Sequence, residues 1–298
     1  MIRVAFVLDL NNTWIGGLNY YRNLLTAIYE NKNEIIQPVI FTSNKANDNL
    51  FEGFPPIEII RNSCFDRYSL GWFFQRSGEK VLNHNYILEN LFYKYNIKVL
   101  SHSDLLGFKS TFPMLGWIPD FQHMHHPEFF TAKDIDNRNQ GFFELCKKST
   151  RIILSSYAAQ KDLACFAPEY VDKSRVLQFV VPSPQPANKV ERTTLEKRYH
   201  FEGNYLHLPN QFWIHKNHML IIEALKIAKL KGKHVHIIAT GTTTDYRQPH
   251  YYRQIIDLAS QYGVIDSFQV LGMVPYSDLL AIMNNSIALI NPSLFEGW

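Results

Sequence analysis

The chain has 298 residues, of which 46% are hydrophobic and 19% are charged, a composition typical of a globular protein with one large or two ordinary domains. Its net charge of +3 is too small to indicate a nucleic-acid-binding protein, although a mild basic surplus also fits an anionic substrate or a membrane surface. Three widely spaced cysteines, Cys64, Cys146 and Cys165, form neither a disulfide framework nor a CxxC metal pair, which indicates a reducing, cytosolic compartment.

The first half of the chain alternates short apolar runs with helix-like stretches. The N-terminal MIRVAFVLDLNN lacks a basic region followed by a small-residue cleavage site, so we expect a first strand there and not a signal peptide. No window reaches the ~18 consecutive apolar residues of a membrane span. The predicted strands are 3–8, 38–42, 97–101, 114–118 and 151–155, and the predicted helices are 18–29, 86–95 and 138–148. This alternation predicts a parallel sheet with helices on both faces.

The second half repeats the pattern with greater regularity. Predicted strands at 205–208, 234–239, 268–271 and 287–290 alternate with predicted helices at 218–230, 251–262 and 277–284. The proline-rich stretch 181–189 separates the two series, because prolines stiffen a connector and are excluded from a central strand. The sequence therefore predicts two α/β domains, residues 1–183 and 184–298. A strand at 287–290 needs a covering helix, so we also expect further residues after Trp298 in the complete protein.

Three groups of polar or glycine residues follow predicted strands, where open α/β sheets bind ligands. Gly16 and Gly17 open a helix after the first strand and let the backbone approach a phosphate, although an ordinary tight turn explains a glycine pair equally well. Lys216 begins a helix early in the second half and is placed to neutralise a diphosphate; the alternative is a solvated lysine. Glu296 and Gly297 follow the last strand, where a carboxylate can accept hydrogen bonds from sugar hydroxyls, unless Glu296 is a surface residue.

The string IPDFQHMHHPEFF concentrates polar side chains after a predicted strand of the first half. Its histidines His123, His125 and His126 raise the question of a metal site, but the spacing implies no fourth ligand. We favour an active-site wall lined by Asp120 and His123, since imidazole titrates near neutral pH and can donate to a phosphate or a sugar hydroxyl.

Two further motifs have simpler explanations. Asp134 and Asp136 match a DxD metal motif, but no strand precedes them, so we expect a solvated helix start. The aromatic cluster Trp72, Phe73 and Phe74 could touch a membrane or a lipid acceptor, but buried packing explains most clusters of this kind and is our expectation here.

The whole chain resembles the family 4 glycosyltransferases. The resemblance rests on the Gly-Gly pair after the first strand, the Lys-Asn pair that opens a helix early in the second half, and SSYAAQKDL. It rests above all on VLGMVPYSDLLAIMNNSIALINPSLFEG near the C-terminus. It implies the GT-B fold, in which two Rossmann-like domains carry parallel sheets that face each other across a cleft, here with the second domain incomplete. Enzymes of this family retain the anomeric configuration and act without a bound metal.

The resemblance also implies how a nucleotide-sugar donor is bound. Gly16 and Gly17 would approach the donor diphosphate, and Lys216 would neutralise it. Met273 and Val274 would present backbone groups to the nucleobase.

The C-terminal residues would complete the donor site. Glu296 corresponds to the first of the family's two donor-site glutamates and would contact the donor sugar, with Gly297 and Trp298 beside the phosphates. The second glutamate would fall beyond Trp298.

Two positions depart from the family pattern. The family's arginine, five residues before Lys216, is Gln211, which removes one positive charge from the phosphate site. The histidine of the family's His-Asp pair falls on Pro119, which leaves Asp120, and we suspect that His123 takes the missing role.

The expected activity is transfer of a sugar from a GDP- or UDP-linked donor to a glycan or lipid-linked acceptor in bacterial surface polysaccharide synthesis. The resemblance implies no bound metal, and we expect no cofactor. The small net charge argues against a nucleic-acid partner and the cysteines indicate a cytoplasmic location, where we expect peripheral association with the inner face of a membrane. Asp120 is our candidate for orienting the acceptor. The alternatives are another GT-B activity, such as a sugar-nucleotide epimerase or a phosphorylase, and a non-catalytic nucleotide-binding protein.

Overall fold

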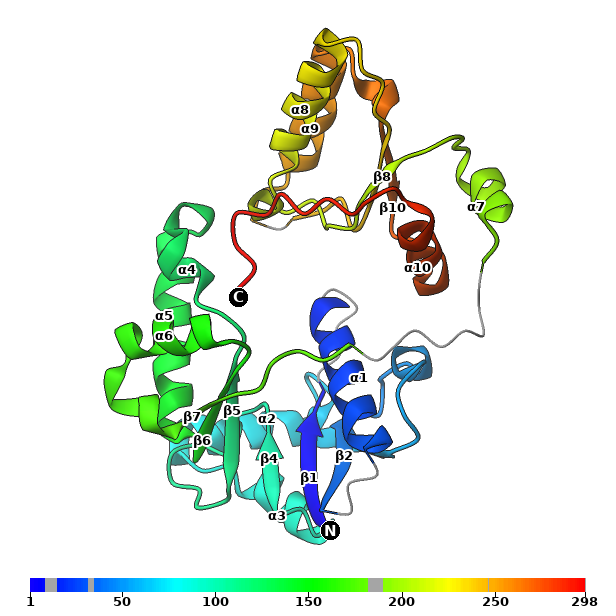
Figure 1. Ribbon diagram of the computed structural model, residues 1–298. Coiled ribbons are helices and arrows are strands. Elements are labelled where there is room, and N and C mark those ends of the chain that lie inside the picture. Colours follow the sequence, from blue (N-terminus) through cyan, green and yellow to red (C-terminus); the bar gives the residue numbers. More distant parts are fainter. Residues whose placement is uncertain (9–14, 32–34, 182–189, 246, 298) are drawn as a thin grey trace. The chain divides into compact units, whose positions relative to one another are not determined.

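A computed structural model describes residues 1–8, 15–31, 35–181, 190–245 and 247–297, and Figure 1 shows its ribbon. The chain forms two compact units. The first comprises Met1–His125, Ala132–Ser183 and Gly297–Trp298, and the second comprises His126–Thr131 and Pro184–Glu296. The predicted domain boundary between residues 183 and 184, and all of the predicted connector except Val181, lie outside the described residues.

The first unit is built on a parallel sheet of seven strands in the order β3-β2-β1-β4-β5-β6-β7. The strands are β1 (Ile2–Val7), β2 (Ile36–Thr42), β3 (Glu58–Arg61), β4 (Val99–Ser101), β5 (Met114–Ile118), β6 (Arg151–Leu154) and β7 (Ser174–Val176). Five of them were expected from the sequence. The two edge strands, β3 and β7, were not, because only one residue of each is buried and neither contains a continuous apolar run.

Helices cover both faces of this sheet. They are α1 (Ile15–Glu30), α2 (Leu70–Ser77), α3 (Tyr86–Lys94), α4 (Gln122–His125), α5 (Ala132–Lys148) and α6 (Tyr157–Phe166), with short helical turns η1 (Asp48–Phe51), η2 (Ser63–Phe65), η3 (Gly78–Leu82) and η5 (Pro168–Lys173). Successive residues of β2 point to opposite faces: Phe41 packs with Phe92 of α3, whereas Ile40 packs with Leu25 of α1. Burial on both faces explains why the strands read as continuous apolar runs.

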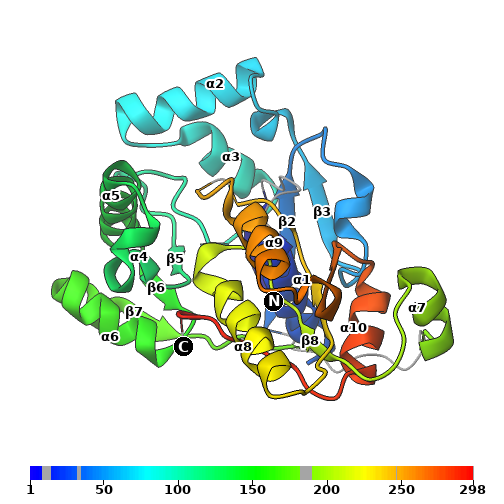
Figure 2. The same ribbon diagram turned by 90° about the horizontal axis from the view of Figure 1, so that it is seen from above.

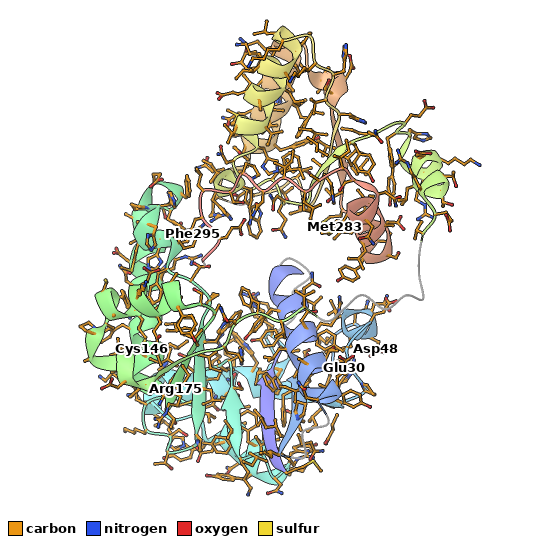
Figure 3. All side chains as sticks on the ribbon, viewed as in Figure 1. Glu30, Asp48, Cys146, Arg175, Met283 and Phe295 are labelled. Carbon is orange, nitrogen blue, oxygen red and sulfur yellow. The ribbon has the colours of Figure 1, made fainter. Side chains whose placement is uncertain are left out.

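Helix α5 is longer at its N-terminus than the predicted 138–148. Asp134 lies in its first turn, which confirms that the DxD string is a helix start. Cys146, labelled in Figure 3, lies near the other end of the helix. It is buried in a cluster with Ile118 and Leu154 of the sheet.

The expectation that the aromatic cluster is buried is wrong. Helix α2 turns Gly71 and Gln75 inward, where a Cβ on Gly71 would lie 3.3 Å from the Cys64 Cα and where Gln75 is buried. Residues on the other sides of so short a helix project away from the unit, so Phe73 and Phe74 are 55% and 64% exposed. Figure 2 shows α2 at the outer edge of the first unit, beside α3.

The second unit has a smaller parallel sheet in the order β10-β9-β8. Its strands are β8 (Leu206–Leu208), β9 (Ile237–Thr240) and β10 (Phe268–Gly272), and its helices are α7 (Arg192–Tyr199), α8 (His218–Leu230), α9 (Tyr251–Gln261) and α10 (Tyr276–Asn285), with turns η4 (Pro127–Phe129), η7 (Ile214–Lys216) and η8 (Ile265–Ser267). Ile237 and Ala239 pack with residues of α8 and α9, whereas Ile238 packs with residues of α7 and α10. Both faces of this sheet are therefore covered as well.

The strand predicted at 287–290 is present only as a single parallel bridge between Leu289 and His207 of β8. The His207 amide donates to Ala288 O over 3.0 Å and the Ile290 amide donates to His207 O over 2.8 Å. These bonds place the segment beside β8, and its direction brings residues 291–296 to the carboxyl end of the sheet. In the described part of the chain, no helix is long and apolar enough to cross a membrane.

Candidate functional site

The loops that follow β8, β9 and β10 leave the second sheet at the same edge, because the three strands are parallel. Backbone hydrogen bonds tie these loops together: the Phe212 amide donates to Thr242 O and the Gly241 amide donates to Gly272 O, each over 2.8 Å. Gly241 has φ = +130°, and a Cβ there would lie 2.7 Å from Asn210 O. Only glycine fits such an approach, so the loops form one fixed rim.

Lys216 and Glu296 meet at this rim although they are 80 residues apart in the sequence. The Lys216 ammonium donates to both carboxylate oxygens of Glu296, over 2.9 and 2.8 Å. The Leu294 amide donates to His215 O over 2.8 Å, so the C-terminal segment runs along η7. Asn217, in the left-handed region at φ = +55°, turns the chain between η7 and α8 and donates to Pro292 O. The structure thus brings together two residues that the sequence marked separately.

The Lys216–Glu296 pair is only partly exposed, with 13% of the lysine side chain and 38% of the glutamate side chain accessible. Burial alone raises the pKa of the Glu296 carboxyl, but hydrogen bonds from Lys216 and Ser293 outweigh this effect and hold the pKa below its ordinary value. The carboxylate is therefore ionised at neutral pH. An anionic ligand that reaches Lys216 has to compete with it.

Arg247 is a second cation of this rim, which the sequence analysis did not identify. It lies in the loop after β9 and pairs with the buried Asp245, Nε to Oδ1 over 3.1 Å. Its guanidinium carbon lies 5.6 Å from the centre of the Trp213 ring. Gln211, at the position where the family has arginine, lies partly exposed in the loop after β8. The only sequence signal for Arg247 is an Asp-x-Arg spacing in a loop after a strand, which is weak.

His215 shows how closely these charges gather. The pKa of its imidazole is lowered to about 4, mainly by burial and in addition by the cations Lys216 and Arg247. Glu296 and Asp245 act in the opposite direction. Two cations and two carboxylates therefore surround one buried ring, which is neutral at pH 7.

Met273 and Val274 form the turn between β10 and α10, at the same edge of the sheet. Met273 is 55% exposed, whereas Val274 packs against the core between the sheet and α10. This position is where the resemblance places the nucleobase contact, and that role stays a prediction.

Gly16 and Gly17 lie in the first turn of α1 and follow residues 9–14, which are outside the described residues. Gly16 is exposed, and apart from its chain neighbours and the backbone of α1, no heavy atom of the described residues lies within 4 Å of a Cβ built on it. Their predicted contact with a diphosphate rests on this helix N-terminus alone.

Asp120 follows β5, and one oxygen of its carboxylate accepts a hydrogen bond from the Gln122 amide at the start of α4. His123 does not line an open wall as expected, because it is 2% exposed, packs against Phe142 and faces Asn139 Oδ1 over 2.9 Å from its Nε2. Burial is also the main reason that its pKa is lowered. In this structure His123 anchors α4 to α5 while Asp120 stays partly exposed.

The other two histidines of this string point to different partners. His125 Nε2 lies 2.9 Å from Asp162 Oδ1, and His126 Nδ1 lies 2.9 Å from Glu128 Oε1. No group of three or more His, Cys, Asp or Glu side chains within the described ranges is arranged to hold a metal ion.

Gly297 belongs to the first unit, where its carbonyl oxygen accepts a hydrogen bond from Ser156 Oγ over 2.6 Å. Ser156 also caps α6 through the Ala159 amide. Trp298 lies outside the described residues.

Known proteins resemble this chain in two ways. Residues 200–298 match the family model described as "Glycosyl transferases group 1", and the matched segment contains the whole rim from Gln211 to Glu296. No curated protein matches the sequence.

Solved structures resemble the whole chain. A glycosyltransferase from Rickettsia africae ESF-5 has a TM-score of 0.61 and 15% identity over 99% of this chain and 74% of that chain. Anabaena Alr3699/HepE in complex with UDP and glucose has a TM-score of 0.68 and 13% identity over 100% of this chain and 76% of that chain. WaaG, a glycosyltransferase involved in lipopolysaccharide biosynthesis, has a TM-score of 0.55 and 13% identity over 100% and 76%. The expected GT-B fold, with two Rossmann-like α/β units, is confirmed.

Proposed function

We propose that this protein transfers a hexose from a GDP- or UDP-linked sugar to a glycan or lipid-linked acceptor, with retention of configuration, and the match of residues 200–298 to the family model of the group 1 glycosyl transferases supports this. The observation that carries the proposal is the Lys216–Glu296 pair at the rim of the second sheet, inside the matched segment. Lipopolysaccharide synthesis by the similar WaaG supports a place in bacterial surface polysaccharide synthesis. The UDP and glucose bound to Alr3699/HepE support a nucleotide-sugar donor.

The rim supplies the electrostatics that such a transfer requires. The bond between the anomeric carbon and the diphosphate breaks, and negative charge grows on the leaving diphosphate while a bond to the acceptor oxygen forms on the same face. Lys216 stabilises that charge from a fixed position, and Arg247 adds the positive charge that is absent at Gln211. Once the diphosphate takes Lys216, the Glu296 carboxylate is released to accept hydrogen bonds from the donor sugar.

Residues of the first unit would act on the acceptor. Asp120, partly exposed after β5, orients the acceptor hydroxyl or helps its proton to leave for an oxygen of the departing diphosphate. His123 is a positioning residue, because it touches Asn139 and fixes the short helix α4 that Asp120 caps. We assign no protein nucleophile. The free, buried thiols of Cys64 and Cys146 support a reducing, cytoplasmic compartment, where the protein would act at the inner face of a membrane.

A non-catalytic nucleotide-binding role is the second candidate, and Gln211 is the observation that favours it. The guanidinium of Arg247 is shared with Asp245, so the rim has less free positive charge than an arginine at position 211 would give. Binding of a nucleotide without turnover would identify this case.

Ligand-observed NMR with GDP, UDP and their common sugars tests the donor site. We expect one nucleotide to give a signal that its own sugar donor displaces and that fades in Lys216→Ala. Lys233→Ala is the matched control, since this exposed lysine precedes β9 at the opposite edge of the sheet. Equal nucleotide signals with Lys216→Ala and Lys233→Ala would show that Lys216 does not bind the nucleotide. The absence of a binding signal for every nucleotide would contradict the proposal.

A further inference from the structure

The surface of the first unit around α2 is unusually apolar. Its large apolar side chains, each more than half exposed, are Tyr68, Leu70, Phe73, Phe74, Val81 and Leu82, here called the α2 face. Single exposed apolar residues are ordinary on a protein surface, but a contiguous group of this size marks a place of contact. The exposed positions follow from the helix itself, because Gly71 and Gln75 take its inner side.

The charge around the α2 face is basic. The Arg67 guanidinium carbon lies 5.3 Å from the centre of the Tyr68 ring, and that of Arg76 lies 5.8 Å from the centre of the Trp72 ring. The sequence from 62 to 82, which spans this face, has three basic residues, Arg67, Arg76 and Lys80, and two acidic residues, Asp66 and Glu79. Asp66 is buried, with hydrogen bonds from Ser43 and Asn44. Aromatic and aliphatic side chains beside arginines are complementary to an anionic lipid surface.

A cavity of about 290 Å³ opens next to this face, between α2 and the carboxyl ends of β1 and β2. Three cationic side chains line it, Lys45, Arg67 and Arg76, together with the apolar Leu8 and Trp72. None of its described lining residues is a carboxylate. Positive charge at the carboxyl edge of a parallel sheet suits a phosphate group.

We propose that the α2 face docks this protein on an anionic lipid bilayer and that the adjoining cavity receives the phosphate of a lipid headgroup. The apolar side chains enter the interfacial region, the arginines meet the lipid phosphates, and the cavity selects a single headgroup. This makes the acceptor a phosphate-bearing lipid. That last step rests on the proposed transferase function, whereas docking on the bilayer does not.

Sedimentation with lipid vesicles tests the docking. We expect binding to vesicles of equal parts phosphatidylglycerol and phosphatidylcholine, and at least ~10-fold weaker binding to pure phosphatidylcholine, because each arginine near an anionic surface contributes on the order of fivefold. The double variant Phe73→Ser/Phe74→Ser should lose about tenfold or more in affinity for the anionic vesicles. Leu220→Ser/Ile227→Ser is the matched control, since both residues are similarly exposed on α8, and it should bind like the wild type.

The outcomes separate cleanly once circular dichroism shows that both variants are folded. A selective loss in the α2 variant supports the proposal. Equal binding by the α2 variant and the wild type, equal loss in both variants, or no binding by the wild type overturns it. None of these outcomes depends on nucleotide binding, so failure here leaves the donor-site measurement unaffected, and the reverse also holds.

Phosphorus NMR tests the cavity with dihexanoyl phosphatidylglycerol below its micelle-forming concentration. We expect its signal to broaden with the wild type and to stay sharp with Ala46→Trp, which fills the cavity, and with Lys45→Gln, which removes a cation from its wall. Inorganic phosphate is the second arm. If it broadens as strongly as the lipid, or if both variants still broaden the lipid signal, the cavity is not a lipid headgroup site.

Discussion

Opposite effects of two substitutions follow from the Lys216–Glu296 pair. In Lys216→Ala a nucleoside diphosphate loses one charge-assisted hydrogen bond, a contact that contributes about 1.5–3 kcal/mol. The net contribution to nucleotide binding is smaller than this, because in the free protein the ammonium is bound to Glu296 over 2.9 and 2.8 Å, and that pair has to break first. With 38% of the glutamate side chain exposed, solvent screens the pair, and breaking it costs about 0–1 kcal/mol.

The net loss in Lys216→Ala is therefore about 0.5–3 kcal/mol, or roughly 2–150-fold in Kd for the nucleotide. Glu296→Gln removes the competing carboxylate, so affinity for the bare nucleoside diphosphate should rise by up to about fivefold. In the same variant the contact to the donor sugar is weakened, and turnover should fall.

Isothermal titration of both single variants and the double variant measures these effects. We expect that Glu296→Gln no longer tightens nucleotide binding once Lys216 is alanine, because the carboxylate then has no ammonium to bind. A change of less than twofold in Lys216→Ala, or weaker nucleotide binding in Glu296→Gln, would refute this reasoning.

Three other predictions concern the rim and the core. Arg247→Gln should weaken nucleotide binding about fivefold. The variant is combined with Asp245→Asn so that no buried carboxylate is left unpaired. A nucleotide Kd in the double variant equal to that of the wild type would exclude Arg247 from the site. Gly241→Ala should lower the free energy of unfolding by about 2–4 kcal/mol, because residue 241 has φ = +130° and its new Cβ would clash with Asn210 O. Gly141→Ala is the control and should be neutral or stabilising, because a Cβ there meets open space. Urea unfolding that finds Gly241→Ala as stable as Gly141→Ala would contradict the close packing of the rim. Burial is the main reason that the pKa values of His207, His215 and His218 are lowered from 6.5 to about 4. Between these pH values the unfolded chain binds more protons than the folded protein, so the free energy of unfolding should fall as the pH drops from 6.5 to 4. A urea unfolding midpoint that stays constant across this range would contradict the prediction.

The rim shows what the sequence could and could not predict. Lys216 and Glu296 each follow a segment that leaves the second sheet at its carboxyl edge, so elementary sheet geometry places both there. Arg247 could not be found in this way, because its loop has no fixed pattern and its position depends on the ion pair with Asp245 and the Trp213 ring. His123 was expected on a surface because it is polar, but its bond to Asn139 on α5 is a tertiary contact that no local pattern encodes.

The fold shows the same division. Strands buried on both faces give continuous apolar runs and were identified. The edge strands β3 and β7 pair on one side only and have one buried residue each, so they give no such run. The exposure of Phe73 and Phe74 was missed for a different reason. An apolar sequence pattern predicts that the side chains are shielded from water. It does not tell whether the protein's own core or an external partner such as a lipid bilayer shields them.

The most direct test of the central claim is a transfer assay followed by mass spectrometry. The protein is incubated with GDP- and UDP-linked hexoses and a mixture of glycan and lipid-phosphate acceptors, with Lys216→Ala alongside. The account predicts one hexose added per acceptor, with one nucleoside diphosphate released for each, and a strongly reduced yield in the variant. An isomerised nucleotide sugar without nucleotide release, or nucleotide bound with no product under any condition, would contradict it.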